Sequence, residues 1–268
     1  MLPILMSIGP VKIFSYGVML TLGLFIALYF WWKMGRDEHF DEIALFDGFF
    51  LSLLTYLVLG RVGYVLLNFE SVGTLAHAIA FLAYPGLSGT VGIIGVSFFL
   101  FAFARAHNWN IWKIGDAYAV SLAIAIAFAG LGGILNGSNP GIEASWGLRY
   151  VGQSVKTAPV DLWIMIWGIV SFAIVSRVRK NFRFYTWYKA ESSMAQEGLA
   201  TLVFGLLIGF HYLVVGWIDQ LNWKIWVFPG QFIIGLVIMG VCGYMISKRV
   251  GRRESTLWSK LVSRIRRN

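Results

Sequence analysis

The sequence predicts an all-α protein that crosses a membrane several times, and three observations support this fold class. Hydrophobic residues make up 58% of the 268-residue chain, and charged residues make up only 13%. The mean hydropathy is +0.70. Long apolar runs recur from one end of the chain to the other. Soluble domains are nearer half apolar and a quarter charged, and disordered chains have low hydrophobicity. The composition therefore excludes a water-soluble globule and a disordered protein.

A spanning helix needs about 20 mostly apolar residues, and the first three spans are expected at 13–32, 43–67 and 90–104. No basic segment precedes the first run, which is long enough to span, so we expect a retained helix and no cleaved signal peptide. The third run is short and begins with glycines. Its N-terminal end is therefore expected to pack against other helices instead of facing lipid.

The fourth span is expected at 116–135 and begins with Asp116, whose carboxylate would complement the positive end of a helix dipole. Three further apolar runs complete a set of seven spans. They are 160–176, 198–217 and 228–247.

Lys and Arg residues predict the orientation, because cytoplasmic loops carry an excess of these residues. With the N-terminus outside, seventeen of the 22 Lys and Arg residues fall in segments assigned to the inside, and four fall outside. The sequence thus predicts an N-terminus outside and a C-terminus inside. The net charge of +9 follows from this topology, so it does not indicate a nucleic-acid partner.

We expect a seven-helix membrane domain over residues 1–250 and a basic amphipathic cytoplasmic tail over residues 251–268. Helical spacing in the tail places its apolar residues on one face and its basic residues on the rest, which suits a helix lying on an anionic inner leaflet. The segment 72–84 is apolar but too short to span, so it is expected at the outer interface. The apolar face of the tail consists of Leu257, Trp258, Leu261 and Ile265.

The motifs of soluble enzymes are absent from the sequence. It has no phosphate-binding loop, dinucleotide fingerprint, nucleophile elbow or metal-binding Cys/His spacing, and its four histidines are scattered. The single cysteine, Cys242, lies in an apolar run and can form no intrachain disulfide. We therefore expect no cofactor and no metal.

Four polar residues lie inside the apolar runs, where burial in a bilayer is costly and each becomes a candidate for function. Arg61 is near the outer end of the second span, where it either pairs within the bundle or binds an anionic lipid. His211 is two-thirds along the sixth span, where it is either a functional group or a hydrogen-bonded packing residue. Asp47 and Asp116 lie towards the inner side, where capping or pairing is the simpler interpretation.

Two glycine-rich segments, 88–95 and 130–137, fall at the same depth as Arg61 on the outer side. Glycines let helices approach closely or break where they line a cavity, and small residues at these spacings also serve helix packing. We predict an outward-facing lipid cavity at this depth, roofed by the loop 138–159.

Several short motifs occur in an order that resembles one family. They are SIGPV at 7–11, SYG at 15–17, GRVGYVL at 60–66, SGTVGIIGV at 88–96, GLGGILNG at 130–137, SWG at 145–147, APVDLW at 158–163 and GQ at 230–231. This order and spacing resemble the bacterial prolipoprotein diacylglyceryl transferases from about residue 7 to residue 247.

The resemblance implies a multi-pass protein of the bacterial cytoplasmic (inner) membrane and a group-transfer reaction. A diacylglyceryl group would move from phosphatidylglycerol to the lipobox cysteine of an exported prolipoprotein, releasing glycerol phosphate. The implied partners are phosphatidylglycerol or another anionic phospholipid, the prolipoprotein signal peptide and the membrane. This chemistry needs positive charge around the leaving phosphate and a base or polar network for the thiol.

The chain departs from the family pattern where that charge is expected. Family members carry arginines in the fourth and sixth spans, but these positions hold Gly130 and His211 here. The first asparagine of the fourth-span signature is replaced by Gly133, and the usual His-Gly-Gly reads Thr90-Val91-Gly92. Two hypotheses follow: a divergent transferase, or a non-catalytic relative that binds phospholipid or a lipoprotein signal peptide. A transporter is a weaker third, because inverted repeats are not evident.

The resemblance and the polar residues together give an expected site. His211 is the catalytic candidate, supplying a proton or a hydrogen bond. Arg61 and Arg149 would supply charge for the phosphate. The full set of expected substrate-binding residues is Tyr16, Arg61, Thr90, Asn136, Gly137 and Arg149.

Overall fold

The computed structural model describes residues 2–9, 11–80, 86–137, 139–150, 153–188, 197–220 and 224–265. The chain divides into two compact units. Unit 1 comprises Met1–Ala27 and Tyr118–Asn268, and unit 2 comprises Leu28–Ala117.

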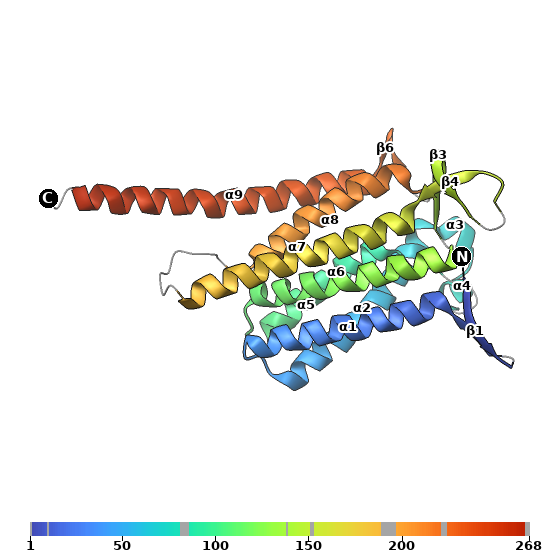
Figure 1. Ribbon diagram of the computed structural model, residues 1–268, viewed down its shortest axis with the longest axis horizontal. Helices are drawn as coiled ribbons and strands as arrows, with labels where there is room; N and C mark the ends of the chain where they lie inside the picture. Colours follow the sequence, from blue (N-terminus) through green and yellow to red (C-terminus); the bar gives the residue numbers. More distant parts are fainter. Residues whose placement is uncertain are drawn as a thin grey trace. The chain divides into compact units, whose positions relative to one another are not determined.

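Seven of the helices in the described chain are long and apolar enough to cross a membrane (Figure 1). The predicted all-α, seven-span membrane protein is therefore confirmed. The helices are α1 (Ser15–Asp37), α2 (Glu42–Leu67), α5 (Gly89–Ala106), α6 (Ile111–Asn136), α7 (Val160–Tyr188), α8 (Leu199–Ile218) and α9 (Gly230–Ile265).

Several boundaries differ from the sequence-based expectation for local reasons. The fourth span begins at Ile111, so Asp116 lies in the second turn of α6 and does not cap the helix. Asp41 caps α2, because its carboxylate accepts a 2.8 Å hydrogen bond from the backbone N–H of Ala44. Gly137 ends α6 with a φ of +69°, a left-handed conformation that glycine adopts without steric cost.

The loops at the ends of the spans contain short elements that apolar periodicity did not predict. The described residues form three antiparallel pairs of strands, each made of two strands that follow one another in the chain. Two short helices lie within or beside the expected interfacial segment 72–84, of which residues 81–84 fall outside the described residues. These elements are β1 (Ile4–Ile8), β2 (Val11–Phe14), α3 (Phe69–Val72), α4 (Leu75–Ile79), β3 (Pro140–Arg149), β4 (Lys156–Pro159), β5 (Lys224–Ile225) and β6 (Phe228–Pro229).

In unit 1, glycines let neighbouring helices pack closely. A Cβ atom built on Gly209 of α8 would lie 2.9 Å from the carbonyl oxygen of Gly235 in α9. A Cβ on Gly168 of α7 would lie 2.6 Å from the backbone nitrogen of Ala127 in α6. Figure 1 shows α7, α8 and α9 side by side in this unit. Such contacts leave no room for larger side chains.

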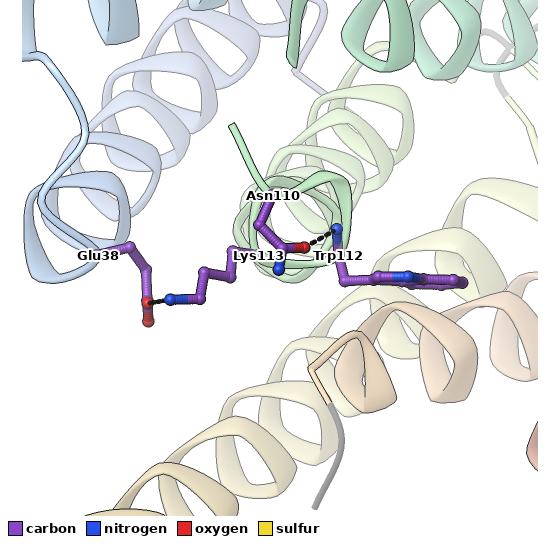
Figure 2. Close-up of polar contacts among 4 residues, drawn as sticks. All are labelled: Glu38, Asn110, Trp112 and Lys113. Carbon is purple, nitrogen blue, oxygen red and sulfur yellow. Dashed lines mark hydrogen bonds and ion pairs between the residues drawn. The ribbon is translucent and has the colours of Figure 1, made fainter. Parts of the chain in front are cut away.

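In unit 2, the glycine-rich start of α5 packs against α2. Gly63 of α2 faces the side chain of Val91, with built-Cβ distances of 2.6 to 2.7 Å, and Gly92 faces the ring of Tyr56. These glycines therefore serve helix packing, one of the two roles considered from the sequence. At the opposite end, the Lys113 ammonium pairs with the Glu38 carboxylate at 2.9 Å (Figure 2). The Trp112 backbone N–H donates a 2.9 Å hydrogen bond to the Asn110 side chain in the same view.

The C-terminal helix α9 extends well past the expected span. Its backbone is helical for 36 residues, through Ile265, and Figure 1 shows it in red running on to the C-terminal end. The side chains from residue 249 onward lie outside the description. The lipid-facing surface of the tail therefore stays a prediction.

Candidate functional site

In unit 1, the starts of α1 and α7 and the ends of α6 and α8 meet the strand pairs β1–β2 and β3–β4 at one end (Figure 1). The backbone N–H of Leu2 donates to the carbonyl of Leu135 at 2.9 Å. The side-chain amide of Gln220 donates to the carbonyl of Gly141 at 2.7 Å. These bonds tie the N-terminal strands to α6 and β3 to the end of α8. The predicted orientation puts this end outside, and it is called the outer end below.

A buried carboxylate lies at this outer end. Asp161 is the second residue of α7, and only 6% of its surface is exposed. Asn139 donates hydrogen bonds to it from both its backbone and its side chain. The oxygen Oδ2 has no hydrogen-bond partner among the described residues. An unsatisfied buried acceptor of this kind is costly to stability, so it is a candidate for function.

Two tyrosines surround the carboxylate. Tyr16, in the first turn of α1, and Tyr150, directly after β3, both lie within electrostatic reach of Asp161. Tyr16 is 38% exposed, whereas Tyr150 is 5% exposed. Burial raises the pKa of the Tyr150 phenol above its ordinary value, and the negative charge of Asp161 raises it further.

Two glycines of α6 explain how α7 comes so close. A Cβ built on Gly130 would lie 2.8 Å from the Cα of Met165 and 2.9 Å from the carbonyl oxygen of Asp161. A Cβ on Gly133 would lie 2.6 Å from both carboxylate oxygens of Asp161. The backbone of α7 thus occupies the space that an arginine at position 130 would need. No arginine side chain fits there while α6 and α7 keep this packing.

Three of the expected substrate-binding residues lie near this carboxylate. The Tyr16 ring packs on Gly132 of α6, with its Cδ2 atom 3.1 Å from a Cβ built on that glycine. Asn136 ends α6 one turn further on, and Gly137 donates its N–H to the carbonyl of Gly133 at 2.7 Å. Tyr16, Asn136 and Gly137 therefore belong to the same end of unit 1 as Asp161.

Arg149 lies at the end of β3 with its side chain exposed. Its partner across the strand pair is Lys156 of β4, which is also exposed. Like charges directly opposite one another destabilise a strand pair. An anion bound between these two cations would relieve that repulsion.

His211 lies deeper in unit 1 than Asp161. It is 8% exposed, and its ring centroid is 4.3 Å from that of Trp167 in α7. Six residues, or about 9 Å of helix, separate Trp167 from Asp161. The His211 Nδ1 atom has no hydrogen-bond partner in the described part of the chain. At this nitrogen, His211 therefore lacks the hydrogen bond that a purely structural packing residue was expected to make.

Arg61 and Thr90 belong to unit 2. The Arg61 guanidinium donates to three backbone carbonyls, those of His77 at 2.8 Å, Ala78 at 2.9 Å and Gly86 at 3.0 Å. Thr90 is half-buried in the first turn of α5, whose N-cap is Ser88. The three bonds tie the segment around α4 to α2, which matches the structural pairing considered from the sequence. Phosphate binding by Arg61 and Thr90 stays a prediction.

Comparison with known proteins places this chain among related sequences. The model of the family "Prolipoprotein diacylglyceryl transferase" matches residues 3–246. The chain belongs to the prolipoprotein diacylglyceryl transferase family. A relative from Clostridium perfringens, named phosphatidylglycerol–prolipoprotein diacylglyceryl transferase 2, is 25% identical and covers 94% of this chain and 98% of that protein.

Two further relatives are named phosphatidylglycerol–prolipoprotein diacylglyceryl transferase. The protein from Legionella pneumophila strain Lens is 26% identical and covers 80% of this chain and 94% of its own length. The protein from Desulfotalea psychrophila is 25% identical over 90% of each chain. The motif order read from the sequence therefore identified the family correctly.

The motif APVDLW at 158–163 contains Asp161, which from the sequence was only a candidate acidic partner for Arg61 and not one of the expected site residues. The available signal was an acidic residue at the second position of an apolar span. Its importance depends on Gly133 and Asn139, which only the fold brings beside it. Among the described residues, no cluster of three or more His, Cys, Asp or Glu side chains could hold a metal ion.

Proposed function

We propose that this protein transfers a diacylglyceryl group from phosphatidylglycerol to the lipobox cysteine thiol of an exported prolipoprotein. The observation that carries the proposal is the family match over residues 3–246, together with relatives named for this activity. Both substrates are held in a membrane, and seven apolar helices suit a protein that must meet them there. The alternative of a non-catalytic relative is less favoured, because each relative described above is named as a transferase.

The leaving phosphate of the lipid needs positive charge. The family resemblance implies an arginine in the fourth span for this purpose, but this chain has Gly130 at that position. We assign this role to Arg149 and Lys156, whose side chains are exposed and directly opposed on β3 and β4. A phosphate between them would accept hydrogen bonds from both and cancel their repulsion. Arg61 and Thr90 of unit 2 remain proposed substrate-binding residues, with Arg61 as a further source of positive charge.

His211 is proposed to supply a hydrogen bond within the membrane-embedded part of the site. It is buried, and its Nδ1 atom has no partner among the described residues. Tyr16, Asn136 and Gly137 would line the outer end of the same unit. The second substrate, the prolipoprotein signal peptide, would enter from the membrane.

We further propose that the protein lies in the bacterial cytoplasmic membrane with its N-terminus outside. Seventeen of the 22 Lys and Arg residues support this orientation. An impermeant thiol reagent applied to intact cells tests it with cysteines introduced at residue 3 and at residue 260. Labelling at residue 3 alone is expected, and labelling at residue 260 alone would reverse the orientation.

The activity is tested with purified protein in vesicles that contain phosphatidylglycerol. A synthetic lipobox peptide is added, and mass spectrometry measures the gain of one diacylglyceryl group. A peptide with serine in place of the cysteine is the control and should gain nothing. Binding of lipid and peptide without any transfer would instead support the non-catalytic alternative.

The charge assignment has its own matched variants. Arg149→Gln combined with Lys156→Gln should reduce transfer at least tenfold, because the phosphate loses both cations. Lys12→Gln, which removes another exposed cation from unit 1 on β2, should leave transfer within about twofold of wild type. Equal activity in all three proteins would remove the two residues from the site.

A further inference from the structure

We propose that the Asp161 carboxylate accepts the proton of the cysteine thiol during transfer. This inference rests on the proposed function and adds a catalytic residue to it. The reaction needs a base because a neutral thiol is a poor nucleophile and the thiolate is the reacting form. The candidates for this base in unit 1 are its buried ionisable side chains, among them Asp161 and His211.

The geometry of Asp161 is that of a group kept ready to take up a proton. Asn139 donates two hydrogen bonds to the carboxylate, and Oδ2 is left without a partner among the described residues. The two bonds fix the orientation of the carboxylate. The remaining oxygen is the acceptor that a proton would occupy. If this position served only packing, an apolar side chain would make the folded protein more stable than a buried carboxylate does.

The groups around Asp161 do not neutralise it. The titratable residues that face it are Tyr16 from α1, Tyr150 after β3 and Asp219 after α8. From α6 it faces the glycines at 130 and 133, which carry no charge. Among the described residues, no Lys or Arg forms an ion pair with Asp161. A proton is therefore the natural counter-charge for this carboxylate.

In this proposal the thiol reaches Asp161 past the side chain of Tyr16. This residue is 38% exposed, whereas Asp161 is 6% exposed. The lipobox thiol would approach along the Tyr16 side of α1, at the outer end where the exported peptide is expected. His211 is a poorer acceptor for this proton, because it lies about two helical turns deeper, under the ring of Trp167.

The S–H bond breaks and its proton moves to Oδ2 of Asp161, which leaves a thiolate. The thiolate sulfur attacks the glyceryl carbon that carries the phosphate ester, forming the thioether C–S bond. The C–O bond to phosphate breaks, and its electron pair leaves with glycerol phosphate. Asp161 then returns its proton to the leaving phosphate or to water.

The test compares Asp161→Asn with wild type in vesicles that contain phosphatidylglycerol, using the lipobox peptide at two pH values. At pH about 7, we expect transfer by the variant to be at least about 100-fold slower, the usual scale for loss of a general base. At pH about 9.5 the thiol of the peptide is itself mostly ionised. The deficit should then shrink at least tenfold, which a merely structural defect would not do.

Glu143→Gln is the matched control, because Glu143 is an exposed carboxylate on β3 of the same unit. It should behave as wild type at both pH values. If Asp161→Asn does not fold, Asp161→Glu replaces it. This variant keeps a carboxylate, so its rate should still fall on the acid side but with a shifted midpoint, and an unshifted profile counts against the proposal.

The outcomes separate the two levels of the argument. An active wild type with Asp161→Asn within threefold of it at pH 7, or with the same deficit at both pH values, overturns the role of Asp161 alone. A wild type that transfers nothing at either pH overturns the proposed function, and the role of Asp161 falls with it.

Discussion

Arg61 in unit 2 and Asp161 in unit 1 are both ionisable residues near the predicted outer ends of membrane spans, but their surroundings differ. Arg61 donates to three backbone carbonyls. Asp161 accepts from Asn139 and keeps one oxygen without a partner among the described residues. A charge in a span is costly. A charged side chain whose hydrogen bonds are all made by the backbone contributes to structure. A charged side chain that keeps an atom without a hydrogen bond is better explained by function.

The largest expected effect is the loss of stability when Arg61 is removed, which tests its structural role. Arg61→Ala removes a charged donor from three carbonyls at once, and each such hydrogen bond contributes about 1.5–3 kcal/mol. We expect the free energy of unfolding to fall by at least about 3 kcal/mol. Thermal or denaturant unfolding in detergent measures the change. Arg61→Lys should recover only part of it, because an ammonium lacks the rigid fork of guanidinium donors.

Lipid binding by the same variants tests the other role predicted for Arg61. Native mass spectrometry compares phosphatidylglycerol with a zwitterionic phospholipid on each variant. Selective loss of the anionic lipid in Arg61→Ala would add a binding role to the structural one. Unchanged binding of both lipids would leave Arg61 as a tie between α2 and the segment around α4.

The second prediction concerns the close contact that brings Asp161 beside α6. Gly130→Ala adds a methyl group 2.8 Å from the Cα of Met165, where backbone atoms cannot easily move aside. Overpacking of this kind costs about 1–3 kcal/mol, and unfolding in detergent should measure a loss of that size. The matched control is Gly240→Ala in α9, where no atom lies within 4 Å of the added Cβ.

The control should be neutral or stabilising by about 0.5–1 kcal/mol, because alanine is the better helix former. Equal changes in unfolding free energy for both variants would mean that α7 can retreat from α6. In that case an arginine at position 130 would also fit, and the present packing would not explain its replacement.

The third prediction concerns His211, which resembles Asp161 in being buried with one polar atom that has no hydrogen-bond partner among the residues the structure describes. His211→Phe keeps an aromatic ring against Trp167 and removes both ring nitrogens. If a nitrogen hydrogen-bonds the reacting groups, transfer should fall about tenfold or more, equivalent to about 1.4 kcal/mol, with the unfolding transition unchanged. Full activity in the transfer assay would make His211 a packing residue.

The sequence predicted the seven spans well because each is set by local composition, and an apolar run of about 20 residues has few alternatives in a bilayer. The strand pairs at the span ends were missed because the other described strands have only two to five residues, and the ten-residue β3 does not alternate strictly between buried and exposed positions. Arg61 was correctly singled out as costly in a span. Its partners could not be predicted, because they are backbone carbonyls, which every residue carries.

Asp161 shows the limit of sequence reasoning for the site. The motif that contains it was noticed, but the features that set it apart are the glycine at 133, the donors of Asn139 and the two tyrosines, which come from four other segments. Replacement of the family arginine by Gly130 was visible in the sequence. That α7 fills the resulting space is a property of the packing.

The smallest expected effect is a change in the pH dependence of stability, caused by the buried phenol of Tyr150 beside Asp161. The pKa of Tyr150 is raised by burial and by the charge of Asp161, so the folded protein holds this proton more tightly than the unfolded chain does. The contribution to stability is present below the ordinary tyrosine pKa of about 10. It is lost as the pH rises towards the raised folded value, because the folded state then has to give up a proton it binds tightly. Tyr150→Phe removes the titrating group, so the difference in unfolding free energy between wild type and variant should decrease above pH 10 and be constant between about pH 7 and 9. Detergent unfolding curves at these pH values measure it. A constant difference across the whole range would mean that neither burial nor the charge of Asp161 raises the pKa of Tyr150 in the folded protein.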